Sequence, residues 1–356
     1  MNTTEITDLR PITDFKGTTF SNYKQTDVRR ELINCLINSN IEPSCYWGAE
    51  MVCSGHFSEL WDILILFYSK YIHISNPKMS IYMEMRIEQF KDILRNGFAD
   101  NELALRNNAK IRHIFVELIT ILCLCKRKHT FQSVVIKNTD YDMVHMTNKM
   151  RATSITFGKS VFMEEDPQEL FIAVNELAYN ITANVQDINY AYFWIEWIIE
   201  FERRCKRKKE KCECERRHKI QVQPKYQMDI IWIVWDVFMT EAKERPPLTP
   251  KIMKALLSIF CLRYSPGISR RRKYVLYCAV AIMCEQSLSQ EDIIKECQKP
   301  ILKNVVERMD IVYKQIKKNE LVSKSNYLLH GLEKNANREQ SIAKLNILYN
   351  SLNEIL

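Results

Sequence analysis

The sequence predicts an all-α fold, a multi-helix bundle built from two helical halves. Apolar residues recur at spacings of three and four along most of the chain, which is the period of an amphipathic helix. The 356 residues include only 7 Gly and 10 Pro, too few turn formers for a many-stranded sandwich or barrel. A chain of this length supplies one large apolar core or two modest ones.

The first half begins with a polar stretch, residues 1–25, which lacks periodicity and which we expect to be loose. The segment "DVRRELINCLIN" then places Val28, Leu32 and Leu36 on one helical face. The segments "FSELWDILILFYSKYI", "NPKMSIYMEMRIEQFKDILRNG" and "NELALRNNAKIRHIFVELITILCLCKRK" continue the same spacing. We therefore assign residues 26–130 to one helical domain.

Residues 131–164 have a different pattern. The short segments "FQSVVI", "TSITF" and "SVFM" are rich in β-branched residues and are separated by polar stretches. This composition is typical of short strands, and we expect a small β hairpin inserted between the helical halves.

The second half, residues 165–356, returns to the helical pattern. Asp166 and Pro167 suit the start of a helix, as a cap and a first helical residue. The paired tryptophans Trp194/Trp197 and Trp232/Trp235 are each spaced by three, so each pair shares a helix face. We expect all four indoles in one buried cluster between two antiparallel helices. The last segment, 338–356, predicts a final amphipathic helix.

Positive charge is concentrated in residues 203–219, which we call the basic arm. The chain has a net charge of +8, and the arm alone holds ten basic and three acidic residues, or +7. The basic residues of the arm are Arg203, Arg204, Lys206, Arg207, Lys208, Lys209, Lys211, Arg216, Arg217 and Lys219. As a continuation of the apolar helix before it, the arm has no apolar face to bury. It must project into solvent or lie against an acidic partner.

Two interpretations of the basic arm stay open. Its cations suit the phosphate backbone of a nucleic acid, without base stacking, because no aromatic residue is interleaved among them. Charge runs are also common on solvated or protein-facing helices, and cations are favoured at a helix C-terminus.

A second basic run, Arg270, Arg271, Arg272 and Lys273, lies at the expected start of a helix. The helix dipole disfavours cations at that end, so an anion or an acidic partner is expected nearby. Simple surface charge is the alternative. We refer to these residues as the 270–273 cluster.

The twelve cysteines are scattered and mostly lie within apolar runs, which is typical of reduced core thiols. In the arm, Cys205, Cys212, Cys214 and His218 carry zinc-binding side chains, but their spacing is not that of a common zinc finger. Zinc binding there would require the helix to end near Lys211. We expect no metal and no other cofactor.

No catalytic or nucleotide-binding motif is present in the sequence. The segment "TFGKS" lacks the earlier glycine of a phosphate-binding loop, because Thr153 stands at that position. We therefore expect a protein that is not an enzyme. The polar start and the lack of a long apolar run predict a cytoplasmic or nuclear protein that does not insert into a membrane.

One stretch, "INSNIEPSCYWGAEMVCSGH", resembles the C-terminal oligomerisation region, or collar, of the RarA/MgsA/WRNIP clamp-loader-like ATPases. The resemblance covers residues 28–82 and rests on the order Ser39-Asn40, Tyr46-Trp47, Ala49, Met51 and Gly55. Asn40 replaces the usual acidic residue, and the family's ATPase domain is missing upstream of the match. The resemblance implies a helical collar without a motor, self-association, and a link to DNA replication or repair.

Together these observations predict a non-enzymatic helical interaction protein that contacts nucleic-acid backbone through the basic arm and the 270–273 cluster. The alternative is a structural or assembly component whose arm binds acidic protein partners. Asn, Ile and Lys are abundant, as expected for a protein encoded by an AT-rich genome. The genome of a large DNA virus would be one such source, and the particle of such a virus would be one such assembly. In that case the protein is expected in the host cell or the virion.

Overall fold

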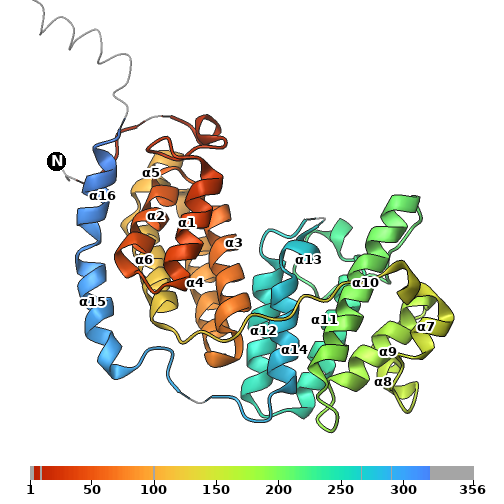
Figure 1. The fold of residues 1–356 in the computed structure, drawn as a ribbon. Helices are drawn as coiled ribbons and strands as arrows, with labels where there is room; N and C mark the ends of the chain where they lie inside the picture. Colours follow the sequence, from red (N-terminus) through yellow and green to blue (C-terminus); the bar gives the residue numbers. More distant parts are fainter. Residues whose placement is uncertain (1–3, 9, 99–100, 266, 290, 321–356) are drawn as a thin grey trace, which may run out of the picture.

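The computed structural model is 66% helical, and its described residues form no strand or sheet (Figure 1). The prediction of an all-α fold is confirmed. Within the described part, the β contact is an isolated bridge between Thr18 and Lys24. The structure describes residues 4–8, 10–98, 101–265, 267–289 and 291–320.

The first helical group follows the pattern of the sequence closely. It consists of α1 (Gln25–Ile37), α2 (Ile41–Cys53), α3 (Phe57–Phe67), α4 (Met79–Ile93), α5 (Glu102–Asn107) and α6 (Ala109–Leu124). Ser39 adopts a left-handed conformation, with φ of 59°, in the tight turn between α1 and α2. Gly48 allows α2 to approach α6 closely, because a Cβ at this position would lie 2.2 Å from Cδ1 of Ile119.

The second helical group carries the basic residues of interest. It consists of α9 (Phe171–Asn180), α10 (Ile188–Lys208), α11 (Ile231–Glu241), α12 (Leu248–Cys261), α13 (Ile268–Arg271) and α14 (Lys273–Cys284). Asp187 caps α10 by accepting a hydrogen bond of 3.2 Å from the backbone N–H of Tyr190. Helix α9 packs against both α10 and α11.

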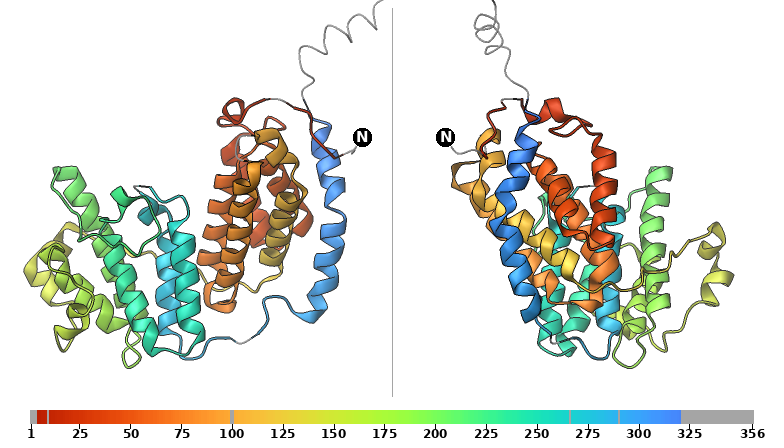
Figure 2. Two further views of the ribbon diagram at one scale, coloured as in Figure 1. Left: turned by 180° about the vertical axis from the view of Figure 1, so that it is seen from behind. Right: turned by 60° about the vertical axis from the view of Figure 1, so that its left-hand side comes forward.

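The two groups share one continuous apolar core. Helix α12 packs on α4, and α14 packs on α3 and on the π-helical turn η2 (Tyr68–Ile72), as the views in Figures 1 and 2 show. The core therefore crosses the division that the sequence suggests at residues 131–164. No described helix combines the length and the apolar character needed to cross a membrane.

The four paired tryptophans are all buried, with no more than 3% of any of them exposed, and they belong to the same apolar core cluster. Trp194 and Trp197 contact each other, with 6.3 Å between ring centroids. Trp232 and Trp235 instead pack on Phe260 of α12. All four indoles therefore lie in one buried core, as expected, while the ring contacts of the α11 pair run to α12.

The predicted β hairpin in residues 131–164 is absent, and that expectation is wrong. The chain instead crosses the second helical group as a long irregular connection (Figure 1) and then forms short helical turns. These are the 3-10 turn η5 (Asn138–Tyr141), α7 (Met143–Thr147) and α8 (Thr156–Lys159). Phe131 packs edge-on against the stacked rings of Tyr192 and Tyr277, at 5.4 and 5.7 Å between centroids, whereas Val135 is 71% exposed. The alternation of apolar and polar residues in this segment arises because one face of an extended chain packs on helices, and no partner strand is involved.

The described residues at the N-terminus are packed, where the sequence suggests a loose segment. Phe15 and Phe20 are fully buried, with 6.2 Å between their ring centroids. The guanidinium of Arg106 donates hydrogen bonds to the carbonyl oxygens of Asp8 and Arg10, at 3.3 and 2.8 Å. A few well-spaced aromatic residues are enough to anchor a segment whose composition is polar.

The last described helices, α15 (Lys299–Glu307) and α16 (Met309–Lys317), leave the second group and lie along α6 and α2 (Figure 2). Tyr313 and Ile316 are buried there, and the guanidinium of Arg112 lies 4.1 Å from the Tyr313 ring centroid. This part of the chain therefore belongs with the first group, although the sequence assigns it to the second. The predicted helix at 338–356 lies outside the described residues.

Candidate functional site: the basic arm and the adjoining groove

The basic arm begins as the exposed end of α10, whose first half is buried by its apolar face. The helix ends in a Schellman-type motif: the N–H groups of Lys209 and Glu210 donate to the carbonyl oxygens of Lys206 and Cys205. Lys209 takes the left-handed conformation, with φ of 60°, that usually favours glycine. The arm is thus shorter than one continuous helix, and its remainder returns as an irregular segment.

Most exposed cations of the arm form ion pairs with carboxylates that lie only a few residues away in the sequence, in the arm itself or just before it. The pairs are Arg203–Glu200 (3.1 Å), Arg207–Glu200 (2.6 Å), Lys206–Glu202 (2.6 Å), Lys208–Glu210 (3.7 Å) and Lys211–Glu213 (3.1 Å). The basic partners remain 53–81% exposed at the side chain. Exposed ion pairs contribute only about 0 to 1 kcal/mol, so an incoming anion can displace these carboxylates.

Arg204 holds the arm to the irregular connection. Its guanidinium lies 4.0 Å from the ring centroid of Tyr141 and donates a hydrogen bond of 3.0 Å to the side-chain oxygen of Asn138. This residue has a structural role as well as a charge.

Arg217 is buried and is not available to a ligand, which corrects its place among the predicted contacts. Its guanidinium forms ion pairs with Asp166, at 2.6 Å, and with Asp236, at 2.8 Å. Burial alone lowers the pKa of Arg217, but the hydrogen bonds to both carboxylates raise it above the ordinary value. Asp166 also accepts the N–H of Glu215, at 2.9 Å, so it fixes the arm and does not cap a helix as the sequence suggests.

The 270–273 cluster is divided between inward and outward residues. Arg272 donates to the carbonyl oxygens of Phe260 and Leu262, at 2.9 and 2.6 Å, and pairs with Asp62 at 2.7 Å. Lys273 pairs with Glu196 at 2.8 Å. The internal carboxylates, together with the C-terminal carbonyls of α12, supply the negative charge that the sequence seemed to require from a ligand. Only Arg270 and Arg271 of the cluster are exposed.

The arm's three cysteines and its histidine do not gather at one point. Cys205 and Cys212 are near each other, whereas the thiol of Cys214 is buried and donates to the carbonyl oxygen of Asp229 at 3.4 Å. His218 is exposed. Burial raises the pKa of Cys214 to about 12, which disfavours the thiolate that zinc requires. Among the described residues, no group of three or more His, Cys, Asp or Glu side chains is placed to hold a metal ion.

A groove of about 1110 Å³ adjoins the arm and connects its last residue to the 270–273 cluster. Lys219 of the arm and Arg271 of the 270–273 cluster both line this groove. The two basic segments therefore meet at the groove. Lys254 and Arg263, from α12 and the turn after it, add two more exposed cations to the same wall. The sequence analysis missed both, because each is an isolated basic residue that only the packing of α12 brings to the groove.

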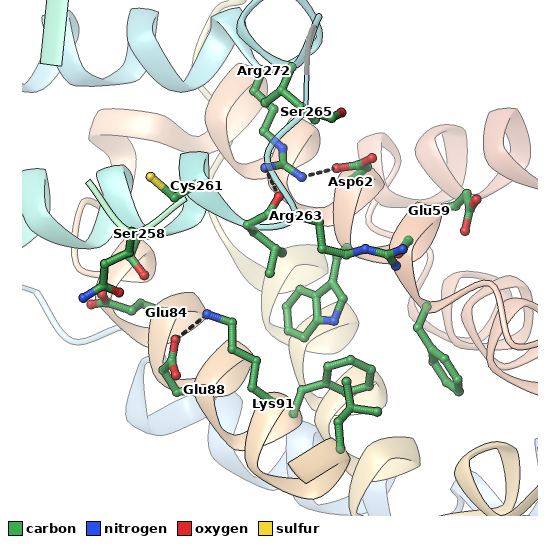
Figure 3. Close-up of a pocket in the computed structure, with 18 of the residues that line it drawn as sticks. Glu59, Asp62, Glu84, Glu88, Lys91, Ser258, Cys261, Arg263, Ser265 and Arg272 are labelled. Carbon is green, nitrogen blue, oxygen red and sulfur yellow. Dashed lines mark hydrogen bonds and ion pairs between the residues drawn. The ribbon is translucent and has the colours of Figure 1, made fainter. Parts of the chain in front are cut away.

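The opposite wall of the groove is acidic. Glu59 and Asp62 of α3 and Glu84 and Glu88 of α4 line it, and Arg272 reaches across to Asp62 (Figure 3). Glu88 is paired with Lys91 at 2.7 Å. The groove therefore has a basic wall and an acidic wall. A polyanion is expected to lie along the basic wall and the arm, away from the acidic wall.

His56 and Cys261 also line the groove. The Nε2 of His56 lies 2.8 Å from the carbonyl oxygen of Thr18. Burial raises the pKa of the Cys261 thiol to about 12.

Compared with known protein families, with curated proteins and with solved structures, the chain shows no match. The collar resemblance of residues 28–82 accordingly stays a prediction from the motif. Helices α1 and α2 follow each other closely in this stretch, an arrangement that occurs in many unrelated folds and does not test the resemblance.

Proposed function

We propose that this chain is a non-enzymatic interaction protein that binds the phosphate backbone of nucleic acids through its basic arm. The observation that carries the proposal is the projection of the arm beyond the packed helices (Figure 1), with Lys208 and Lys211 exposed by 62% and 81% at the side chain. Lys209 and Arg216 are exposed beside them. Exposed cations that lack an apolar face can reach phosphates without any change in the fold.

The outward part of the 270–273 cluster extends the proposed surface. Arg270 and Arg271 are exposed, and Arg271 shares the groove wall with Lys219, Lys254 and Arg263. Cations of this kind bind phosphates and carry no base sequence information. The resemblance to a clamp-loader collar favours a place for this binding in DNA replication or repair.

The test is salt-dependent binding of fluorescein-labelled single- and double-stranded DNA and RNA, measured by anisotropy. The variant replaces Lys208, Lys209, Lys211 and Arg216 by Gln. We expect weaker binding to every sequence alike, and a salt slope that is shallower by about 0.9 for each phosphate that the variant no longer neutralises. The control replaces Lys24, Lys251, Lys303 and Lys314, which are also exposed but lie elsewhere, and should keep the wild-type slope. Absent binding at about 50 mM salt, or equally weakened binding in both variants, would refute the proposal.

A second candidate, an assembly component with acidic protein partners, is favoured by a specific observation. The arm's cations already engage carboxylates, such as Arg207 with Glu200 and Lys206 with Glu202. Poly-glutamate of matched charge distinguishes the two functions. Competition with DNA at equal charge concentration supports the protein partner, whereas a clear preference for DNA supports phosphate binding.

A further inference from the structure

A second groove, of about 620 Å³, lies between α2 and the pair α15–α16, far from the basic arm. Its lining is mainly apolar: Pro43, Cys45, Tyr46, Trp47, Val116, Val305, Met309, Ile311 and Val312. Tyr23 stands at its edge, and the Trp47 ring makes edge-on contacts with Tyr23 and Tyr46, both at 5.2 Å between centroids. The groove is therefore an aromatic-edged channel on the first helical group.

The helices that form the outer wall of this groove are incompletely covered. Helix α15 has no fully buried side chain, although its apolar residues form a clear stripe along one face. Of the residues that line the groove, Ile311 is 62% exposed and Tyr23 is 42% exposed. Apolar side chains gathered at a groove in this way indicate a surface that another apolar element covers.

The chain itself contains a segment with the required pattern. In residues 338–356, Ile342, Leu345, Leu348, Leu352 and Ile355 recur at spacings of three and four, with polar residues between them. As a helix, this segment would present one apolar stripe, and α15 and α16 lie on the groove with stripes of the same kind. We propose that residues 338–356, which lie outside the described part, bind as an amphipathic helix in the groove between α2 and α15–α16 of the same chain.

The tether between groove and segment favours binding within one chain. Residues 321–337 can span about 55 Å when extended at ~3.3 Å per residue. The groove residues Asn304 to Gln315 lie only about 17 Å apart along their helices at ~1.5 Å per residue. A connection of this length gives an effective concentration of about millimolar, far above that of a second copy in dilute solution.

The test is hydrogen exchange of the full chain, read by mass spectrometry on peptides from 338–356 and from the groove. Ile311→Asp places a charge in the groove at a residue exposed enough to leave the fold intact. We expect exchange in 338–356 to become about tenfold faster or more. The reciprocal double variant Leu345→Asp/Leu348→Asp should speed exchange in residues 41–47. The control Val144→Asp charges an apolar residue that is 68% exposed but distant, and should change neither region.

The outcomes of this experiment distinguish between the occupants. Fast exchange in 338–356 of the wild-type chain, or protection that Ile311→Asp leaves unchanged, overturns the proposal. Protection that disappears on dilution, together with a dimer mass in light scattering, overturns binding within one chain and assigns the groove to the segment of a second copy. Reciprocal loss of protection in a monomer supports the proposal.

Discussion

At the scale of single residues, the partners of an arginine decide whether it is buried or exposed, and its neighbours in the sequence do not. Arg216 and Arg217 are adjacent, yet Arg216 is exposed and Arg217 is buried with 2% of its side chain accessible. The difference comes from Asp166 and Asp236, which lie 51 and 19 residues away in the sequence and, of the two arginines, pair with Arg217. A buried guanidinium needs such partners, because an unpaired buried charge is strongly unfavourable.

Replacing Arg217 by Ala should lower the free energy of unfolding by about 3 to 5 kcal/mol at pH 7, since two carboxylates lose their buried partner. Burial raises the pKa of Asp236, and the Arg217 guanidinium opposes that rise. Without Arg217 the folded-state pKa rises further, so the protonated carboxyl is favoured in the folded protein. The loss of stability should therefore be smallest below the ordinary pKa near 4 and grow as the pH rises.

Urea unfolding at several pH values measures this effect, with Arg216→Ala as the matched control. The control should stay within about 0.5 kcal/mol of wild type, as is usual for an exposed residue. A pH-independent loss in Arg217→Ala would contradict the assignment of the buried ion pairs.

At the scale of elements, α10 combines two functions along its length. Its first half is part of the core, and its second half carries the exposed cations of the arm and contacts the Asn138–Tyr141 turn through Arg204. Trp197 marks the boundary: its Nε1 donates to the carbonyl oxygen of Asp140 at 3.0 Å, and its ring packs on Tyr141 at 4.8 Å and on Phe201 at 5.4 Å. The arm is rigid at its base because this tryptophan joins two elements.

Replacing Trp197 by Ala should cost about 3 to 5 kcal/mol of stability, because it removes a large buried ring and a buried hydrogen bond. It should also release the Asn138–Tyr141 turn, so hydrogen exchange in that turn should accelerate more than in α12. Thermal unfolding and exchange measure the two effects. Met143→Ala, at a residue 62% exposed in the adjacent α7, is the control. Wild-type stability in Trp197→Ala would count against this packing.

At the scale of the whole molecule, Arg272 connects the two helical groups. It binds the carbonyl oxygens at the end of α12 and crosses the groove to Asp62 of α3. The same interaction forms the end of the groove, so the shape of the candidate site depends on how the groups are joined.

Replacing Arg272 by Leu should reduce stability by about 2 to 4 kcal/mol, because helix-end carbonyls and a carboxylate lose their donor. As the core is continuous, protection from hydrogen exchange in α3 and in α14 should fall together. The control Arg271→Leu changes the exposed neighbouring residue and should leave the protection of α3 and of α14 unchanged. Loss of protection in α14 alone would indicate two independent domains, as the sequence suggests.

The sequence by itself determined the helical class, the burial of the four paired tryptophans and the exposure of most of the basic arm. These features follow from the local spacing of apolar residues and from local charge. Trp194 and Trp197 share a face in any α-helix of normal pitch, and Lys208 and Lys211 lie in a stretch without an apolar face that could be buried. Only the tertiary structure decided that Arg217 and Arg272 turn inward, that Phe131 packs among helices and not in a hairpin, and that Lys254 and Arg263 join Lys219 at one groove. Each of these depends on a partner distant in the sequence, and a local pattern carries no information about which distant carboxylate, ring or cation will be brought beside it.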